Sequence, residues 1–282
     1  MIIITGQTAT GKTKLALELA KNIPPPGGGE LINFDSRQIY KYLDIITGKD
    51  IPKTKIWLYD VVLPNEYFSS FDFVKKVTPI IEDIKKRGKI PILVGGTYLY
   101  LKHLLYGFDE NNSPPDFKLR EKLNSKSVNY LQKMLIKLNK KVFDGLNHSD
   151  QLNPRRLIRK IEITKSKTKT VLNKTVFIKS VPEIFIGLRY KDKSKLRQVI
   201  IKRVEKRLKN GAVEEVEKLL KMGYKKTDPG LKTIGYQQII KYLNKELTKE
   251  KAINDWINKE VQYAKRQLTF MKNDKNIKWR EI

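Results

Sequence analysis

The chain opens with a short apolar run that leads into a segment of fixed glycine spacing. Met1 to Thr5 is rich in β-branched residues, and Gly6 to Thr13 (GQTATGKT) fits the pattern Gly, four residues, Gly, Lys, then Ser or Thr. Leu15 and Leu19 follow at helical spacing. A strand, such a loop and a helix in this order turn backbone N–H groups toward a phosphate at the helix N-terminus. The sequence therefore predicts a phosphate-binding loop (P-loop) in an α/β fold.

Two side chains of this loop carry the chemistry expected of it. Lys12 adds a positive charge beside a terminal phosphate, and the Thr13 hydroxyl is a candidate ligand for Mg²⁺. The alternative is a chance glycine-rich turn with no ligand, which the match in both motif and context disfavours. The loop alone leaves open whether the chain is a kinase, a nucleoside triphosphatase or a transferase.

Strands and helices alternate on both sides of a long central stretch. Buried-strand candidates are Leu31–Phe34, Ile56–Val62, Ile90–Val94 and Glu183–Leu188. Helices are expected over Phe71–Arg87, Lys193–Met222, Gly230–Leu243 and Thr248–Met271. This order predicts a parallel sheet flanked by helices, with residues 1–112 and 183–282 forming one core.

The central stretch contains no convincing strand. Helical spacing covers Phe117–Leu123, Val128–Leu138 and Asn153–Thr164, and a Lys/Thr-rich connector, Lys165–Lys174, follows. We interpret residues 113–182 as an all-helical insertion domain within the α/β core.

Basic residues are concentrated in this insertion. The 282-residue chain has 58 Lys and Arg against 30 Asp and Glu, a net charge of +28. Residues 114–182 alone hold 17 Lys or Arg and 5 Asp or Glu. Lys and Arg gain affinity for a polyanion by releasing counterions from its phosphates. A nucleic-acid partner is therefore expected, although nucleotide bias in the genome accounts for part of the excess.

The composition also excludes several kinds of site. The sequence has no cysteine, so it has no disulfide, thiolate zinc site or cysteine nucleophile. Its two histidines, His103 and His148, are too scattered for an imidazole metal cluster. No apolar stretch approaches the ~20 residues that span a bilayer, and no signal peptide is evident. A cytoplasmic protein with no membrane partner is expected.

Polar residues stand at the ends of two further predicted strands. Asp35-Ser36-Arg37-Gln38 follows the second strand, and Gly95-Gly96-Thr97 follows Val94. Carboxyl ends of parallel strands meet at the edge where open α/β sheets bind ligands. Asp35 is a candidate general base or Mg²⁺ ligand, with the N-cap of a helix beginning at Ser36 as the structural alternative. We expect the three strand ends to form one site.

Eight sequence blocks, in this order, resemble tRNA dimethylallyltransferases (tRNA isopentenyltransferases) of the bacterial type. The blocks are GQTATGKT, DSRQIY, LDIITGK, PILVGGTYLYL, NPRRLIRKIEI, KRVEKRLKNGAVEEV, TIGYQQI and YAKRQLTF. The resemblance runs from Ile3 to Trp279. It implies a P-loop nucleoside-triphosphatase-like core with a helical insertion, which is similar to the layout expected above.

The resemblance implies a reaction that is unusual for a P-loop. The loop would hold dimethylallyl diphosphate, and N6 of the adenosine 3′ of the anticodon in tRNA (adenosine-37) would displace the diphosphate. Asp35 would accept the N6 proton, and cations would stabilise the leaving group. Asp35, Thr97 and Arg203 match the family's catalytic positions. Diphosphate contacts are implied for Thr97, Arg203, Mg²⁺ on Thr13, and the loop residues Gly6, Gln7, Thr8, Ala9, Thr10, Gly11, Lys12 and Thr13.

The resemblance also implies contacts with the anticodon stem-loop of tRNA. It assigns the target adenosine to Asp35, Ser36, Arg37, Gln38 and Thr97. It assigns further RNA contacts to Arg120, Arg155, Arg156, Leu157, Ile158, Arg159, Lys265 and Arg266. Arg155 and Arg159 are four residues apart and share a helix face, from which two guanidiniums can reach neighbouring phosphates. For each basic residue taken singly, a solvated side chain is the plainer interpretation.

Four positions near the site depart from the family's pattern. Gln7 stands where proline is usual, Ile46 and Tyr98 stand at glycine positions, and Gly48 replaces alanine. We expect Tyr98 and Ile46 to narrow or reshape the channel for the isoprenoid group, which leaves the length of the prenyl donor open.

Other functions remain open on the sequence. An adenylate isopentenyltransferase acting on free nucleotide shares the chemistry but does not need the basic insertion. A non-catalytic RNA-binding P-loop protein is disfavoured because Asp35, Lys12 and Thr97 occur together. A small-molecule kinase is the third alternative. The expected enzyme is a monomer that uses Mg²⁺, tRNA and dimethylallyl diphosphate.

Overall fold

The computed structural model describes residues 1–24, 27–49, 54–108, 115–166 and 182–282. The chain divides into two compact units, Met1–Leu105 with Phe177–Ile282, and Tyr106–Val176. The boundaries predicted from the sequence, 112/113 and 182/183, lie within or beside stretches outside the described residues. Most of the predicted connector after Lys165 also lies outside them.

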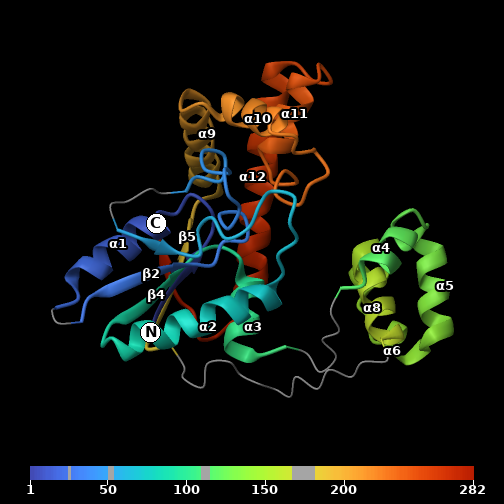
Figure 1. Cartoon of the computed structure of the whole chain (residues 1–282), viewed down its shortest axis with the longest axis horizontal. Coiled ribbons are helices and arrows are strands. Elements are labelled where there is room, and N and C mark those ends of the chain that lie inside the picture. The colour runs from blue at the N-terminus through green and yellow to red at the C-terminus, as the bar shows by residue number, and fades with distance from the viewer. Residues whose placement is uncertain (25–26, 50–53, 109–114, 167–181) are drawn as a thin grey trace. The chain divides into compact units, whose positions relative to one another are not determined.

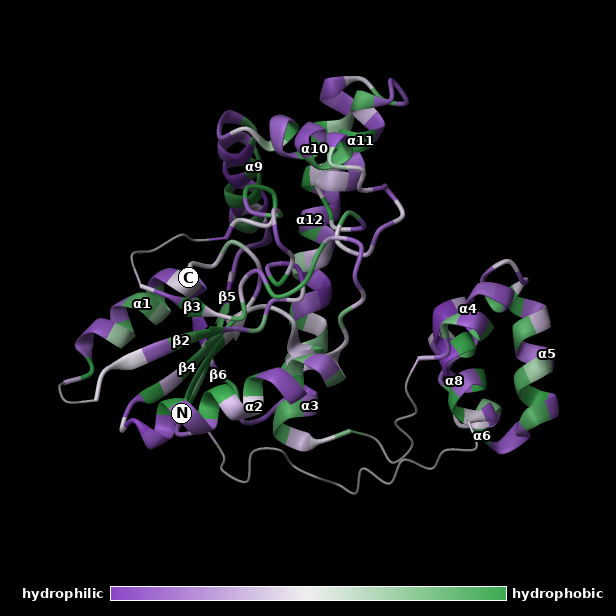
Figure 2. Ribbon diagram, viewed as in Figure 1, coloured by the Kyte–Doolittle hydropathy of each residue, from purple (hydrophilic) through white to green (hydrophobic). Residues whose placement is uncertain are grey.

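The first unit is built on a six-stranded parallel sheet in the order β3-β2-β4-β1-β5-β6 (Figure 1). Its strands are β1 (Ile2–Gly6), β2 (Gly29–Asn33), β3 (Ile56–Trp57), β4 (Ile90–Val94), β5 (Ile184–Arg189) and β6 (Lys278–Glu281). β1 lies inside the sheet between β4 and β5 and is buried along its whole length. The strands in the middle of the sheet are coloured as mainly hydrophobic in Figure 2, as expected where helices cover both faces, whereas the edge strand β6 is polar and mostly exposed. The predicted parallel α/β fold is confirmed.

Helices cover the two faces of this sheet. They are α1 (Lys12–Asn22), α2 (Ser70–Lys86) and α3 (Tyr98–Tyr106). Ala16 of α1 packs with Ile2 and Ile4, whereas the fully buried Ile3 points to the opposite face. No helix among the described residues is long and apolar enough to cross a membrane.

Four further helices of the first unit share a second core. They are α9 (Lys193–Lys209), α10 (Ala212–Lys221), α11 (Tyr236–Leu243) and α12 (Lys249–Met271). Trp256 and Tyr236 are fully buried there against Ile39, Leu43 and Ile46 of the segment after β2. This packing holds that segment beside the carboxyl ends of the strands.

The described part of the second unit contains only helices. They are α4 (Phe117–Asn124), α5 (Val128–Leu138), α6 (Lys140–Asp144), α7 (His148–Gln151) and α8 (Pro154–Lys165). Leu131 and Leu135 of α5 pack against Leu157 and Ile161 of α8 in its core. Asn153 caps α8 through its side chain, with proline as the first helical residue.

The structure corrects three of the predicted elements. The expected helix Lys193–Met222 is two helices, because Gly211 between them has a φ of 95°. The expected strand Ile56–Val62 ends at Trp57, since Leu58 and Asp60 have positive φ angles. The expected helix Gly230–Leu243 begins only at Tyr236. The sequence analysis did not predict the elements α3, α6, α7 and β6.

Candidate active site

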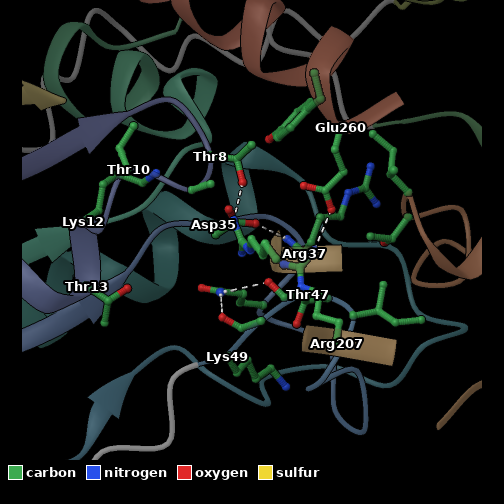
Figure 3. Close-up of a pocket in the computed structure, with 18 of the residues that line it drawn as sticks. Thr8, Thr10, Lys12, Thr13, Asp35, Arg37, Thr47, Lys49, Arg207 and Glu260 are labelled. Carbon is green, nitrogen blue, oxygen red and sulfur yellow. Dashed lines mark hydrogen bonds and ion pairs between the residues drawn. The ribbon is translucent and has the colours of Figure 1, made fainter. Parts of the chain in front are cut away.

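A pocket of about 1260 Å³ in the first unit gathers the three predicted strand ends. It is lined by Thr8–Thr13 after β1, Asp35 after β2 and Gly95 after β4, with side chains from α9 and α12. In Figure 3, Lys12 and Thr13 lie on one side, Arg207 and Glu260 on the other, and Asp35 between them. Ten Lys or Arg and three Asp or Glu line the pocket, so its field favours an anion.

The loop after β1 has the backbone that its glycines predict. Gly6 has a φ of 133°, and a Cβ there would lie 2.1 Å from the carbonyl oxygen of Leu188, so only glycine fits. Lys12 Nζ donates to the carbonyl oxygen of Gln7 at 2.6 Å. Desolvation and, to a smaller extent, the Arg203 charge lower the pKa of Lys12 to about 8, and the Asp35 charge opposes this change. Lys12 therefore stays mainly protonated at neutral pH.

Gln7, the departure from the usual proline, anchors the loop on two sides. Its Oε1 accepts from the Tyr190 N–H at 2.9 Å, and its Nε2 donates to the Ala264 carbonyl oxygen at 3.4 Å. The side chain is buried. Gln7 thus ties the loop to the segment after β5 and to α12.

Asp35 faces the pocket while one of its oxygens holds a turn. Its Oδ1 accepts from the Arg37 N–H at 2.9 Å. The expected helix from Ser36 is absent, and residues 36–39 form turns. The Asp35 Oδ2 lies 3.6 Å from the place that a Cβ on Gly96 would occupy. Arg37 and Gln38 also line the pocket, and Gln38 Nε2 donates to the Gly48 carbonyl oxygen at 3.0 Å.

The predicted catalytic residues Thr97 and Arg203 have different positions. The Thr97 hydroxyl accepts from the Ser36 N–H at 2.9 Å and lies 3.1 Å from the Ser36 Oγ. Thr97 is not among the residues that line the pocket. Arg203 lines it, and its Nη1 donates to the Thr8 Oγ1 at 2.6 Å. A diphosphate contact by Thr97 stays a prediction.

Helix α12 contributes pocket residues that the sequence analysis missed. Glu260, Tyr263 and Gln267 are three and four residues apart, which places them on one helix face. The sequence signal for them was polar residues at helical spacing on a face that otherwise packs into the core. No neighbouring residue in the sequence indicated that this face lines a site. Burial raises the pKa of the Tyr263 phenol, and the Asp35 charge raises it further, so Tyr263 stays neutral.

Glu260 forms a buried ion pair inside this basic pocket. The Nη1 of Arg207 lies 2.6 Å from the Glu260 Oε1, and Trp256 Nε1 donates to the same oxygen at 3.1 Å. Burial opposes ionisation of Glu260, but the Arg207 and Arg203 charges outweigh it and hold the pKa of the carboxyl below its ordinary value. Glu260 therefore keeps Arg207 in place as a charged partner.

Two departures near the site differ in their effect on the pocket. The Tyr98 hydroxyl donates to Asp274 Oδ2 at 2.7 Å, and its ring meets Phe270 edge to face. Tyr98 is not among the residues that line this pocket, so the expectation that it narrows or reshapes the channel for the isoprenoid group stays a prediction. Ile46 does line the pocket, and it packs into the core beside Gly235.

The structure also places the residues predicted to contact RNA. Leu157 and Ile158 are buried in the core of the second unit, so their side chains are not exposed to RNA and these two predictions are corrected. Arg120 and Arg159 both bind the buried carboxylate of Glu162. The remaining arginines of α8 are more exposed: Arg156 pairs with Asp150, and Arg155 is exposed. In the first unit, Arg266 lines the pocket, whereas Lys265 is exposed outside its lining.

The residues of the pocket fit an Mg²⁺ ion that arrives with phosphate. The described residues contain no group of three or more His, Cys, Asp or Glu side chains suited to a metal. Mg²⁺ commonly takes only one or two protein ligands, with water and substrate phosphates completing its shell. Thr13 and Asp35 line the same pocket and offer a hydroxyl and a carboxylate.

Fold and pocket together define a P-loop α/β protein whose anion site lies beside a carboxylate. A family model described as IPP transferase matches residues 38–274. The tRNA dimethylallyltransferase of Caldanaerobacter subterraneus is 36% identical, and the match covers 99% of this chain and 90% of that one. The tRNA dimethylallyltransferase of Clostridioides difficile is 37% identical, and the match covers 100% of this chain and 91% of that one. The chain belongs to the IPP transferase family, as the sequence blocks predicted.

Solved structures agree with this assignment. The full-length tRNA isopentenylpyrophosphate transferase of Bacillus halodurans is 32% identical with a TM-score of 0.70, and the match covers 99% of this chain and 89% of that one. A eukaryotic dimethylallyltransferase acting on tRNA is 26% identical with a TM-score of 0.78, and the match covers 100% of this chain and 73% of that one.

Proposed function

We propose that this chain transfers the dimethylallyl group of dimethylallyl diphosphate to N6 of the adenosine 3′ of the anticodon (adenosine-37) in tRNA and releases diphosphate. The observation that carries the proposal is that Asp35 and the P-loop Lys12 line one pocket. The names of the relatives, tRNA dimethylallyltransferases, support the same reaction.

The P-loop side of the pocket receives the leaving group. Lys12, Arg203 and the loop N–H groups surround the diphosphate. As the allylic C–O bond breaks, its electron pair passes to the diphosphate oxygen, and these fixed donors stabilise the added charge. Mg²⁺ held by the diphosphate and the Thr13 hydroxyl supplies further positive charge when bound.

The Asp35 side receives the acceptor base. The N6 lone pair forms the new C–N bond, and the N6 proton passes to the Asp35 carboxylate. Oδ1 of Asp35 already accepts from the Arg37 N–H, so Oδ2, the oxygen toward Gly96, takes the proton. Base and leaving-group site are thus held at the ends of β2 and β1, on either side of β4 in one sheet, which supplies orientation.

Basic residues of both units bind the RNA. In the second unit the exposed Arg155 and its neighbours contact phosphates, and in the first unit Arg37 and Arg266 lie at the pocket. Bases beside an anticodon are loop bases, which can leave the stack without breaking a duplex. Described residues of a single chain supply the whole pocket, so we expect a monomer. We also expect the protein to meet its tRNA in the cytoplasm.

The alternatives predict different substrates. An adenylate isopentenyltransferase acts on free nucleotide and has no need of a basic helical unit. A non-catalytic RNA-binding protein forms no product. A small-molecule kinase transfers phosphate from ATP, whereas a carboxylate beside the diphosphate site suits removal of a proton from an amine.

The test is incubation of the folded chain with dimethylallyl diphosphate, Mg²⁺ and an unmodified tRNA transcript, followed by nuclease digestion and mass spectrometry. We expect N6-isopentenyladenosine at position 37 and none in a matched transcript with guanosine there. Product from AMP but not from tRNA would support the free-nucleotide enzyme. Phosphate transfer from ATP without prenylated RNA would support the kinase, and binding without product the non-catalytic protein.

A further inference from the structure

One side chain of α12 connects two of the three strand ends. Gln267 Oε1 accepts from the backbone N–H of Thr8 at 2.8 Å, and its Nε2 donates to the carbonyl oxygen of Gly96 at 3.0 Å. A single amide thus bonds both to the phosphate-binding loop and to the loop after β4. The side chain is buried and lines the pocket.

The surroundings of Gln267 leave little freedom for this amide. A Cβ on Gly96 would lie 2.2 Å from Gln267 Nε2, so the amide reaches the backbone only because position 96 has no side chain. A primary amide holds an acceptor oxygen and an NH2 donor group in fixed planar geometry, and each of the two makes one of these bonds. Loss of these bonds would deprive a part-buried N–H at Thr8 and a buried carbonyl at Gly96 of this partner.

Further hydrogen bonds connect the two partners of Gln267 to the proposed diphosphate site on one side and to the segment of Asp35 on the other. On the diphosphate side, Thr8 also accepts from Arg203 through its hydroxyl. On the acceptor side, Thr97 follows Gly96 and its hydroxyl accepts from the Ser36 N–H, next to Asp35. The Asp35 Oδ2 faces Gly96 itself. Gln267 therefore stands between the loop that holds the leaving group and the segment that carries the base.

We propose that Gln267 is a positioning residue that fixes the distance between the diphosphate loop and Asp35. It touches neither reacting atom and acts through the Thr8 and Gly96 backbone groups. Because it occupies the Thr8 N–H, the diphosphate is bound by the loop N–H groups that follow Thr8. The rate measurement below rests on the proposed function, whereas the exchange measurement does not.

The first test compares Gln267→Met with Gln262→Met, a matched change at an exposed position of the same helix. Single-turnover rates are measured with saturating tRNA and prenyl donor. Each rate is divided by the concentration of binding sites, which is determined by titration with diphosphate. We expect Gln267→Met to lower the rate about 10- to 100-fold, because misplacement of reacting groups has effects of this size. Affinities for diphosphate and tRNA should stay close to those of Gln262→Met. A purely structural role would change the number of folded sites but not the rate per site.

The near-isosteric Gln267→Glu keeps the acceptor for Thr8 but loses the donor to Gly96, so its rate per site should also fall. It carries the test if Gln267→Met does not fold. Rates per site equal to that of Gln262→Met overturn the proposal.

The second test uses amide hydrogen exchange of Thr8, followed by NMR on labelled protein without substrate. We expect exchange about tenfold faster in Gln267→Met than in Gln262→Met, because only the former removes the partner of this N–H. Unchanged exchange overturns the role of Gln267. Absence of prenylated tRNA with the unaltered chain contradicts the proposed function, and the exchange result then decides the inference alone.

Discussion

The pKa values of two ionisable residues in the pocket, Lys12 and Glu260, are shifted by different neighbouring charges. Lys12 is half-buried near a second cation, Arg203, and desolvation together with that charge lowers its pKa to about 8. Glu260 is buried against Arg207, whose charge holds the pKa of the carboxyl below its ordinary value. A predominantly basic pocket thus contains one cation that loses its proton in mildly alkaline solution and one carboxylate that stays ionised.

Diphosphate should bind more weakly as the pH rises above about 8. Binding needs protonated Lys12, and in the chain without ligand its pKa is lowered to about 8 from 10.5. The logarithm of Kd should then rise by up to about one per pH unit. Calorimetric titration across this range is the measurement. Lys12→Arg is the control, because arginine stays charged over this range and the diphosphate itself titrates identically in both experiments. Parallel plots of log Kd against pH for the two proteins would contradict the prediction.

The same pKa shift affects folding stability with a definite sign. Between about pH 8 and 10.5 unfolded Lys12 binds more protons than folded Lys12, so this residue makes stability rise with pH in that window. Denaturant unfolding of the unaltered chain and of Lys12→Met at pH 8 and pH 10 separates its contribution. The difference between the two proteins should change with pH, and a constant difference would be the contrary result.

Asp35→Asn should separate the chemistry from the local structure. Asparagine keeps an oxygen that accepts from the Arg37 N–H, so the turn after β2 is retained. It cannot take the N6 proton, so the single-turnover rate should fall about 10²- to 10⁴-fold, the size of general-base effects. Diphosphate and tRNA affinities measured beside the rate should change little. A rate near that of the unaltered chain would remove Asp35 from the proton transfer.

At the scale of the elements, the features that could be predicted from the sequence are those whose cause lies within one segment or in the geometry of a parallel sheet. β4 matches its predicted bounds, and α1 lies where the spacing of Leu15 and Leu19 predicted a helix, because each signal is contained within its own segment. The convergence of the P-loop, Asp35 and Gly95 was also predictable, since parallel strands bring their carboxyl ends to one edge. The face of α12 that carries Glu260 and Gln267 was not predictable, because the partners of these two side chains lie 53, 171 and 259 residues away along the chain.

The second unit depends on a single buried carboxylate. Glu162 of α8 accepts from Arg120 Nε and Nη2, both at 2.9 Å, from Arg159, and from the backbone N–H of Asp116. Burial opposes its ionisation, but the two arginines hold its pKa below the ordinary value. This network explains why a basic helix bears a glutamate on its buried side.

Glu162→Gln should therefore destabilise the second unit by about 2–4 kcal/mol, near the lower end for a broken buried pair because the arginines are partly exposed. Denaturant unfolding followed by circular dichroism is the measurement, with Glu121→Gln at an exposed position of α4 as the matched control. The loss should shrink as the pH falls below about 4.5, because Glu162 takes up a proton there in the unfolded chain, whereas its pKa in the folded chain is lower. Equal stability of the two variants would contradict the role of Glu162.

At the scale of the whole molecule, the excess positive charge divides between two tasks. Ten basic residues, Lys12 and Arg203 among them, line the pocket of the first unit and suit it to a small, highly charged ligand. The second unit carries basic residues on short helices around a small core, and none of its described residues lines this pocket. RNA affinity should therefore depend on both units, and diphosphate affinity only on the first.

The salt dependence of tRNA binding should distinguish an RNA-contacting arginine from a structural one. Arg155 is exposed on α8, whereas Arg159 is committed to Glu162. Arg155→Ala should reduce the slope of log Kd against log salt by about one if its guanidinium neutralises one phosphate. Lys76→Ala, an exposed position on α2, removes the same charge from the first unit and should leave the slope unchanged. Equal slopes for the two variants, measured by fluorescence anisotropy with a labelled anticodon stem-loop, would take α8 out of the RNA interface.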